Sequence, residues 1–275
     1  MLLFPHAKIN IGLNVVRKRP DGYHDLETVF YPIPLQDVLE IRPLRNSNAP
    51  YAFQLVGPPL GIQPEQNLVV KVYVALQKEY QLPPLDIYLQ KRIPVGAGLG
   101  GGSSDAAFML KAINEMYDLG MSGSDMEQRI ARYGADCAFF INARPAFATG
   151  IGDQLSPLTL SLKGLTLVLV KPDIFVSTKE AYSHVQPHDP EQDLKQLLSS
   201  PVEQWRDQVQ NDFEKSVFTL HPKIAAIKST LYDMGAAYAS MSGSGSTVYG
   251  LFREPPMEAQ SIFADCFVFQ QKLRI

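Results

Sequence analysis

The glycine-rich stretch from Pro94 to Ser104 constrains the fold of this chain more than any other part of its sequence. It reads PVGAGLGGGSS and contains five glycines in eleven residues. Such a run does not form a strand or the interior of a helix, because each glycine raises the entropic cost of ordering the backbone. The segment that follows, from Asp105 to Ile113, has the apolar spacing of a helix, and serine is favoured where a helix begins. The sequence therefore predicts a loop that leads directly into a helix.

A glycine loop at the start of a helix is typical of an anion site. The loop lets backbone N–H groups approach the anion closely, and the positive end of the helix dipole lies behind them. Phosphate is the anion that we expect here. The alternative is a flexible linker, but linkers rarely run directly into a strong helix, so phosphate binding is the favoured interpretation.

The stretch differs from both common nucleotide motifs. A Walker loop needs a lysine beside the serines, and none is present. Gly96, Gly98 and Gly101 have the spacing G-x-G-x-x-G, but a dinucleotide fold also needs an acidic residue about 20 positions later at the end of a strand. Asp125 stands near that distance, yet it follows Ser122-Gly123-Ser124, which is typical of a helix cap. We therefore reject a dinucleotide fold.

The composition is that of an ordinary globular protein, with 45% hydrophobic and 19% charged residues in a chain of 275. The net charge of −3 argues against a dedicated nucleic-acid surface, which is normally basic. The two cysteines, Cys137 and Cys266, have no metal-site spacing. The strongest apolar run, 165–170, is far shorter than the about 20 residues of a membrane span. We expect a cytoplasmic monomer or homodimer without nucleic-acid or membrane partners.

Two stretches of the N-terminal half place polar side chains where a site could form. Residues 7–16 alternate as a strand, and Lys8, Asn10 and Asn14 lie opposite its apolar set. This face either lines a site or faces solvent. A Pro-Asp-Gly turn then presents Tyr23 and His24. An aromatic ring beside a titratable donor suits a flat heterocycle, although such a pair is also common in purely structural settings.

A carboxylate in the stretch Gly134-Ala135-Asp136 is a third candidate. Asp136 stands between small residues and an apolar run, so we expect it to be at least partly buried. A buried carboxylate needs a partner, or its pKa rises until it becomes neutral. Asp136 is therefore either a structural hydrogen-bonding residue or a catalytic one.

The second half of the chain has a different pattern. A strand that looks buried begins at residue 165, and we place a domain boundary just before it, which gives domains 1–160 and 161–275. The predicted order is strand–helix–strand–strand–helix–strand with insertions, which is a ferredoxin-like pattern. A second small-residue loop, Met241 to Thr247, follows one of these strands. Two loops that could bind anions point to a nucleotide or to two phosphate groups.

Periodicity predicts the helices of this second half. Residues 192–198 and 202–209 are predicted helical segments, and a short helix is expected from Thr178 to Tyr182. Ile224, Ile227 and Leu231 have the spacing of one amphipathic helix face.

These motifs together resemble the small-molecule kinases that include galactokinase, homoserine kinase and mevalonate kinase. Their ATP loop usually reads GLGSS, whereas this chain has GLGGGSSDAA. That variant is similar to the 4-diphosphocytidyl-2-C-methyl-D-erythritol kinase family. The other motifs that carry this resemblance are Ala7-Lys8-Ile9-Asn10, Gly22-Tyr23-His24, Gly134-Ala135-Asp136 and Ser242-Gly243-Ser244-Gly245. They occur in the family's order over nearly the whole chain.

The resemblance implies an α+β fold with two domains, an N-terminal ribosomal-protein-like α/β half and a C-terminal ferredoxin-like half, with the active site in the cleft between them. It implies ATP and Mg²⁺ as cofactors and a small-molecule substrate. It also implies the reaction, which is transfer of the γ-phosphoryl group of ATP to the 2-hydroxyl of 4-diphosphocytidyl-2-C-methyl-D-erythritol in the non-mevalonate isoprenoid pathway.

Roles for single residues follow from the matched positions. Asp136 matches the catalytic base and Lys8 the lysine beside it. A nearby ammonium keeps a partly buried carboxylate ionised and stabilises charge on the transferring phosphoryl group. The positions matched to ATP are Asn67 and Lys91 near the adenine, and Pro94, Val95, Gly96, Ala97, Gly98, Leu99, Gly100, Gly101, Gly102, Ser103 and Ser104 around the phosphates, with Ser104 also a candidate Mg²⁺ ligand. The positions matched to the substrate are Asn10, Tyr23, His24, Thr178, Tyr182, Gly243, Ser244 and Gly245, where Tyr23 and Tyr182 would enclose the cytosine and His24 would hydrogen-bond to it.

The chain departs from the family at Cys137 and Ala138, where Val-Pro is common. We expect Cys137 to be a buried, inert thiol. One alternative to the favoured function is another kinase of the superfamily, acting on homoserine or mevalonate. The Gly-Tyr-His motif disfavours it, because those kinases have no cytosine to hold. A second alternative is a nucleotide-binding regulator or a ribosomal-type RNA-binding fold, which the acidic net charge disfavours.

Overall fold

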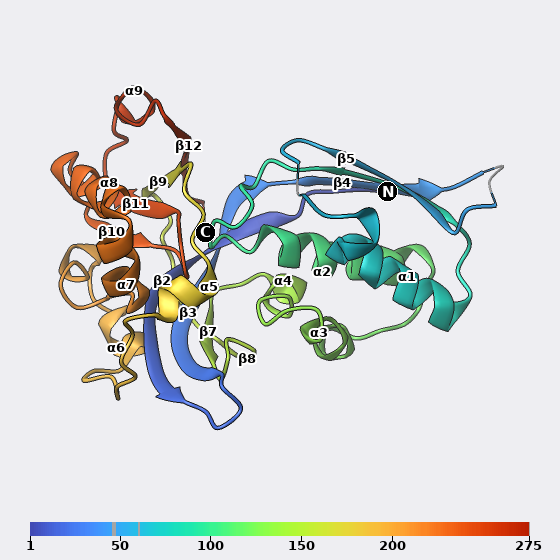
Figure 1. Cartoon of the computed structure of the whole chain (residues 1–275), viewed down its shortest axis with the longest axis horizontal. Helices are drawn as coiled ribbons and strands as arrows, with labels where there is room; N and C mark the ends of the chain where they lie inside the picture. Colours follow the sequence, from blue (N-terminus) through green and yellow to red (C-terminus); the bar gives the residue numbers. More distant parts are fainter. Residues whose placement is uncertain (46–47, 60, 275) are drawn as a thin grey trace. The chain divides into compact units, whose positions relative to one another are not determined.

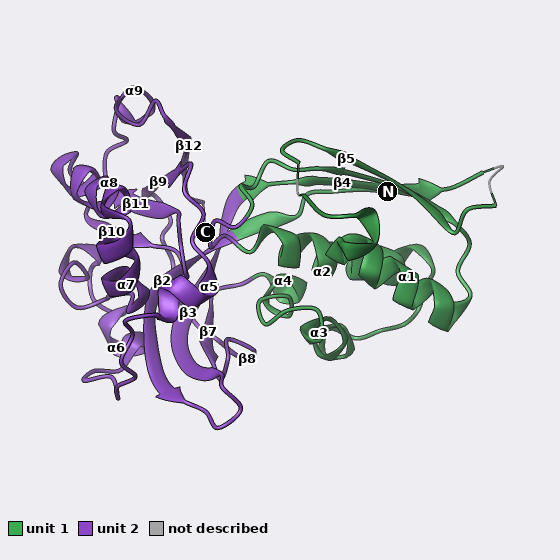
Figure 2. Cartoon of the chain, viewed as in Figure 1, with its two compact units in different colours: residues 1–7, 35–95, 100–143 green, residues 8–34, 96–99, 144–275 purple. Residues whose placement is uncertain are grey.

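The structure of the protein is a computed structural model that describes residues 1–45, 48–59 and 61–274 (Figure 1). The chain forms two compact units, each built from segments that are separate in the sequence (Figure 2). Unit 1 consists of residues 1–7, 35–95 and 100–143, and unit 2 of residues 8–34, 96–99 and 144–275. The glycine loop is therefore divided between the units. The boundary predicted near residue 160 divides the chain differently and stays a prediction.

Unit 1 contains a four-stranded sheet in the order β1 (Leu2–Leu3), β4 (Val38–Pro43), β6 (Leu85–Gln90) and β5 (Tyr51–Val56). β5 and β6 are parallel, with helix α1 (Leu68–Tyr80) between them in the chain, and the other two pairs are antiparallel. Alternate residues of β6, Leu85, Ile87 and Leu89, are fully buried, as the two-residue period of a strand requires.

The remaining helices of unit 1 are η1 (Pro64–Gln66), α2 (Gly101–Met116), α3 (Gly123–Ala131) and α4 (Phe139–Asn142). α1 and α2 pack against each other beside the sheet (Figure 1). α3 begins after Ser122, whose hydroxyl accepts a hydrogen bond from Asp125 N at 3.1 Å. This confirms that Ser122-Gly123-Ser124-Asp125 is a helix cap. The rejection of a dinucleotide fold was based on that interpretation.

Unit 2 contains most of one four-stranded sheet and the whole of another. The first has the order β2 (His6–Lys18), β3 (His24–Gln36), β7 (Ala146–Thr149) and β8 (Gln154–Pro157). The second has the order β10 (Tyr238–Met241), β11 (Val248–Phe252), β9 (Thr166–Pro172) and β12 (Cys266–Lys272), and all its pairs are antiparallel. With helices between β9 and β10 and between β11 and β12, this is the predicted ferredoxin-like arrangement.

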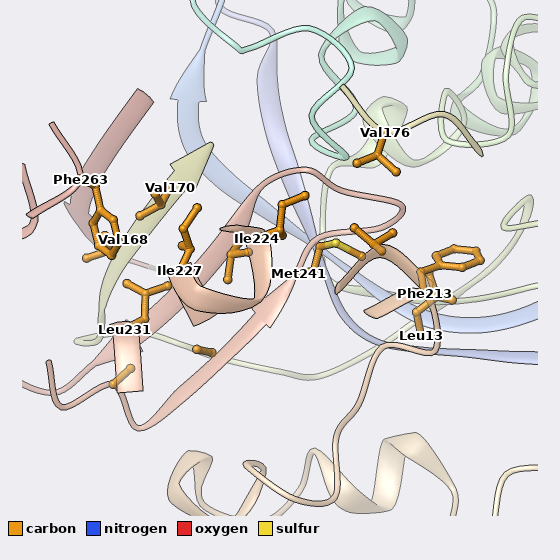
Figure 3. Close-up of a cluster of buried hydrophobic side chains, with 14 of the residues drawn as sticks. Leu13, Val168, Val170, Val176, Phe213, Ile224, Ile227, Leu231, Met241 and Phe263 are labelled. Atoms are coloured by element: carbon orange, nitrogen blue, oxygen red, sulfur yellow. The ribbon is translucent and has the colours of Figure 1, made fainter. Parts of the chain in front are cut away.

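The helices of unit 2 are α5 (Thr178–Tyr182), α6 (Leu194–Leu197), η2 (Val202–Gln204), α7 (Phe213–Leu220), α8 (Pro222–Asp233) and α9 (Ala259–Ile262). Ile224, Ile227 and Leu231 of α8 lie in one buried cluster with Val168 and Val170 of β9 (Figure 3). The amphipathic face predicted from their spacing is therefore the face that α8 buries. No helix in the described ranges is long and apolar enough to cross a membrane.

One helix prediction in unit 2 was wrong, and one helix was missed. Residues 202–209 are helical only as far as Gln204. Trp205 ends the helix, because its ring is buried and its indole N–H donates to Ser200 O at 3.0 Å, so tertiary packing outweighs local periodicity. Helix α7 was not predicted, although the buried pair Phe213 and Val217 has the spacing of one helical turn.

Candidate active site

The glycine loop bends through left-handed backbone at alternate positions before α2 begins. Gly96, Gly98 and Gly100 have φ values of 60°, 74° and 70°, a region that side chains disfavour. Gly100 is the residue before the helix, and α2 starts at Gly101. The helix thus begins earlier than the serines, and Ser103 lies inside its first turn. N–H groups of a first turn have no partner within the helix, so this end of α2 can donate to an anion.

Ser104 is the residue of the loop that best fits a metal ion or a phosphate oxygen. Its Oγ is fully buried and has no hydrogen-bond partner among the described residues. Gly102, two positions earlier, is exposed, so the start of the helix is not sealed beneath other segments. Within the part of the chain that the structure describes, no group of three or more His, Cys, Asp or Glu side chains could hold a metal ion. A cation here would share its coordination with phosphate oxygens, as Mg²⁺ usually does.

In unit 2, residues 96–99 of the glycine loop lie against the second small-residue loop. Ala97 O accepts from Thr247 N at 3.4 Å, and Gly98 O accepts from Ser242 Oγ at 2.8 Å. The two backbones approach so closely that a Cβ on Gly98 would lie 2.0 Å from Ser242 O. Only glycine fits at this crossing.

The predicted substrate loop Gly243-Ser244-Gly245 is held by the protein itself. Asn211 Nδ2 donates to the carbonyl oxygens of Met241 and Gly243, both at 2.8 Å. Gly243 and Gly245 are buried, and Ser244 is half-buried. Of these three residues Ser244 has the best access to a ligand, and the contact of the loop with substrate stays a prediction.

Lys8 and Asn10 lie on the same face of β2, as the strand pattern predicted. Both are 3% exposed, and Lys8 Nζ donates to Asn10 Oδ1 at 2.5 Å. Asn10 Nδ2 in turn donates to Thr28 Oγ1 at 3.0 Å, and Lys8 N donates to Leu99 O in the glycine loop at 3.0 Å. The ammonium of Lys8 also lies 5.0 Å from the centre of the Phe30 ring. The strand, its lysine and the loop are therefore directly connected within unit 2.

Asp136 lies in a turn of unit 1 that packs against the first turn of α2. A Cβ on Gly134 would lie 3.3 Å from Cys137 Sγ and 3.6 Å from Ser103 Oγ. Asp136 itself is half-buried, as expected. Burial raises the pKa of Cys137 to about 11, against the opposing effect of its hydrogen bond with Ser103, so this residue is a protonated thiol. The expectation of a buried, inert cysteine is confirmed.

Lys91 forms a buried charge cluster in unit 1. Its Nζ donates to Asp37 Oδ2 and, at 2.6 Å, to Asp105 Oδ2. Burial alone would lower the pKa of Lys91, but the two carboxylates raise it on balance, so the residue stays charged. Asp37 Oδ1 also accepts from the backbone N–H groups of Arg92 and Ile93, at 2.5 and 2.8 Å. The cluster connects the end of β6 with the start of α2, and the predicted contact of Lys91 with adenine stays a prediction.

Asn67, the other residue matched to adenine, caps helix α1. Its Oδ1 accepts from Val69 N at 2.9 Å, and the residue is 7% exposed. A helix start at this position was predicted, and the cap confirms it. One polar atom of the side chain is therefore already used within the protein.

The residues matched to cytosine lie in unit 2, but their rings are paired differently from the prediction. His24 stacks on Tyr182, with ring centres 4.5 Å apart and planes 24° apart. Tyr23 is 62% exposed. Thr178 is exposed in the first turn of α5, one turn before Tyr182. The sandwich of Tyr23 and Tyr182 around a base stays a prediction.

Burial, and then the charge of Lys18, lower the pKa of His24, so its imidazole is neutral near pH 7. A neutral imidazole has one donor and one acceptor nitrogen. In this form His24 can hydrogen-bond to a heterocycle whose edge has both a donor and an acceptor group.

The predicted site residues are divided between the two units. Unit 1 holds Asn67, Lys91, Asp136 and residues 100–104, and unit 2 holds Lys8, the substrate residues and residues 96–99. The pairing of Lys8 with Asp136 joins one residue of each unit and stays a prediction.

Asp37 and Asp105 were missed by the sequence analysis, and Ser242 was predicted only as part of the second small-residue loop, without its contacts to Gly98 and Asn10. Asp105 had a usable signal, because it stands beside Ser104 on the apolar side of the helix after the loop. The contacts of Asp37 and Ser242 are with residues 54 and 144 positions away, which no local pattern indicates.

Comparison with known proteins identifies the family. The domain described as GHMP kinases N terminal domain matches residues 67–144, and the one described as GHMP kinases C terminal matches residues 192–266. A protein of Bacteroides fragilis (strain YCH46) named 4-diphosphocytidyl-2-C-methyl-D-erythritol kinase is 55% identical over 274 residues, which is 100% of both chains. A protein of the same name from Parabacteroides distasonis is 53% identical over 99% of this chain and 100% of its own.

A solved structure supports the same assignment. The crystal structure of a 4-(cytidine 5'-diphospho)-2C-methyl-D-erythritol kinase is 32% identical, with a TM-score of 0.84 over 98% of each chain. The expected α+β fold and the expectation of a kinase are thereby confirmed. The similarity extends over the whole chain, so this protein belongs to the GHMP kinases and, within them, to the 4-diphosphocytidyl-2-C-methyl-D-erythritol kinase family.

Proposed function

We propose that this protein transfers the γ-phosphoryl group of ATP to the 2-hydroxyl of 4-diphosphocytidyl-2-C-methyl-D-erythritol, in the non-mevalonate route to isoprenoid precursors. The relatives with 55% and 53% identity carry the corresponding name. The observation that best supports the proposal lies inside unit 1. There the turn that contains Asp136 packs against the first turn of α2, so the proposed base and the proposed phosphate site are neighbours.

ATP binds with its phosphates at residues 94–104. The N–H groups of the first turn of α2 donate to phosphate oxygens, and the helix dipole adds to the attraction. Mg²⁺ neutralises part of the phosphate charge when it is bound, and the buried, unpartnered Oγ of Ser104 is the protein atom that fits it. Asn67 and Lys91 are matched to the adenine end.

Asp136 accepts the proton of the substrate's 2-hydroxyl. The oxygen of that hydroxyl forms a bond to the γ-phosphorus while the bond from phosphorus to the leaving oxygen of ADP breaks. Lys8 stabilises negative charge on the transferring group, and Asn10 orients Lys8 through their 2.5 Å hydrogen bond. The transition state of phosphoryl transfer is loose, so alignment and charge stabilisation contribute more than the strength of the base.

The cytidine part of the substrate binds at Tyr23, His24 and Tyr182. The exposed ring of Tyr23 offers a face on which cytosine can stack. The neutral imidazole of His24 hydrogen-bonds to the base edge. Thr178 and the loop Gly243-Ser244-Gly245 contact the diphosphate and methylerythritol portions.

The test is a measurement of ADP release with three acceptor alcohols offered separately, namely 4-diphosphocytidyl-2-C-methyl-D-erythritol, homoserine and mevalonate. We expect kcat/KM for the cytidine compound to exceed the other two values by several orders of magnitude. A preference for homoserine or mevalonate would refute the proposed substrate.

The role of Asp136 is tested with Asp136→Asn and a matched control. Asp118→Asn is that control, because Asp118 is an exposed carboxylate of unit 1 whose φ of 49° asparagine also tolerates. We expect Asp136→Asn to lower kcat by orders of magnitude while ATP binding persists, and Asp118→Asn to change neither. Unchanged turnover in Asp136→Asn would refute the base assignment.

The protein acts, in this proposal, in the cytoplasm as a monomer or homodimer, without a nucleic-acid partner. The net charge of −3 and the two free cysteines support these assignments. Light scattering of the purified protein tests the assembly, and a larger oligomer would contradict it.

A further inference from the structure

Ser242 is a buried serine whose hydroxyl touches two segments of the proposed active site. It is fully buried at the end of β10. Its Oγ donates to Gly98 O at 2.8 Å and accepts from Asn10 N at 3.1 Å. These partners lie 144 and 232 positions away in the sequence, one in the glycine loop and the other on β2. A single hydroxyl therefore joins three distant segments.

The position of this hydroxyl is fixed by the backbone around it. Ser242 N donates to Thr247 O at 2.9 Å, and Ser242 O accepts from Gly245 N at 3.0 Å. On the strand side, the buried hydroxyl of Tyr249 donates to Asn10 O at 2.9 Å. The serine and its strand partner are thus both held in place independently of the bond between them.

The bridge through Ser242 links the glycine loop to β2, and a second link is the hydrogen bond from Lys8 N to Leu99 O at 3.0 Å. Lys8 and Asn10 are the β2 residues assigned to the phosphoryl group and the acceptor, and Gly98 and Leu99 belong to the loop assigned to ATP. The two links therefore set the register between the strand that serves the acceptor and the loop that serves the nucleotide.

We propose that Ser242 is a positioning residue that keeps the glycine loop and β2 in one register for phosphoryl transfer. The inference rests on the proposed function of both segments. Without the hydroxyl, Gly98 O and Asn10 N lose their common partner, and the loop can shift along the strand. Each substrate still has its own binding residues, so binding survives, but the reacting atoms are less well aligned, and a misplacement of about 1 Å costs up to about 100-fold in rate.

The experiment compares Ser242→Ala and Ser242→Cys with Ser240→Ala. Ser240 is the matched control because it is an equally buried serine on β10. Its Oγ donates to Glu214 Oε1 at 3.1 Å and lies 3.5 Å from Met241 O, so its partners are neither the glycine loop nor β2. For each variant we would measure kcat, KM for both substrates and the melting temperature. We expect kcat of Ser242→Ala to fall by about 10- to 100-fold with each KM within about 3-fold of wild type. Ser240→Ala should keep kcat within about 2-fold despite a comparable loss of melting temperature.

Ser242→Cys keeps nearly the same shape with a weaker hydrogen bond, so its kcat should lie between those of wild type and Ser242→Ala. The inference is overturned if Ser242→Ala has the same kcat as Ser240→Ala. Should Ser242→Ala fail to fold, the cysteine variant decides, and a wild-type kcat in that variant would overturn the inference. Failure of the proposed function looks different, because wild type and Ser240→Ala would then also lack activity on the cytidine substrate.

Discussion

Asp105 offers the most quantitative test of how this fold carries buried charge. The residue is 2% exposed, its Oδ2 lies 2.6 Å from Lys91 Nζ, and its Oδ1 has no hydrogen-bond partner in the described part of the chain. Lys91 also contacts Asp37, so one ammonium serves two carboxylates. Burial raises the pKa of Asp105 to about 7, with Lys91 opposing the increase and Asp37 adding to it.

The consequence for stability follows from the protons bound by each state. An unfolded aspartate ionises near its ordinary pKa of 3.8, whereas the folded one keeps its proton up to a pKa of about 7. Across this window the folded state binds the additional proton, so the free energy of unfolding falls as pH rises, by about 1.4 kcal/mol per pH unit. From pH 5 to pH 7 this residue lowers the stability by about 2 kcal/mol, and the total reaches about 3 kcal/mol by pH 8, where its contribution becomes nearly constant.

Asp105→Asn removes the titrating group and keeps the shape of the side chain. We would measure the free energy of unfolding by denaturant titration from pH 5 to pH 8 in the presence of EDTA, for the variant, wild type and Asp118→Asn. The stability of Asp105→Asn relative to wild type should increase by about 3 kcal/mol between pH 5 and pH 8. Asp118→Asn, at an exposed position, should run parallel to wild type. A pH-independent difference between Asp105→Asn and wild type, or a slope of opposite sign, would refute the reasoning.

Other residues give shorter tests. Gly98→Ala would place a Cβ 2.0 Å from Ser242 O at a φ of 74°, so we expect a lower melting temperature and loss of kinase activity in the coupled assay. A Cβ on Gly102 would meet no atom within 4 Å and would lie in a helix, so Gly102→Ala should not lower the melting temperature. If phosphates approach this position, the variant should have a higher KM for ATP. An unchanged KM would count against the phosphate site. Lys91→Met leaves two buried carboxylates without their cation, so it should lower the free energy of unfolding, measured by denaturant titration, by about 3–5 kcal/mol. A decrease below about 1 kcal/mol would show that the lysine and the two carboxylates are weakly coupled. Because the pKa of His24 is lowered, its imidazole is neutral at pH 7 and above, so KM for the cytidine substrate should be constant there and increase only at acidic pH. A KM that changes between pH 7 and pH 8 would contradict a neutral imidazole.

Several features of the fold could be predicted from the sequence because their causes are local. The glycine loop leads into a helix, the Ser122 cap begins α3, and β2 alternates so that Lys8 and Asn10 share a face. The ferredoxin-like order of the last four strands also followed from the sequence of elements. The helix predicted over 202–209 was wrong because local periodicity carries no information about the buried ring of Trp205.

The sequence by itself determined the family and the local motifs, since turn chemistry, helix spacing and strand alternation act over a few residues. Only the tertiary structure decided how those motifs are held. The tertiary structure places the ammonium of Lys91 between Asp37 and Asp105, because a buried charge needs an opposite charge close to it, while the expected contact of Lys91 with a nucleotide base stays a prediction. The partners of the Ser242 hydroxyl, Gly98 O and Asn10 N, likewise come from segments that only the fold brings to it. Contacts of this kind form between segments that the folded core brings together, and the order of residues along the chain does not encode them locally.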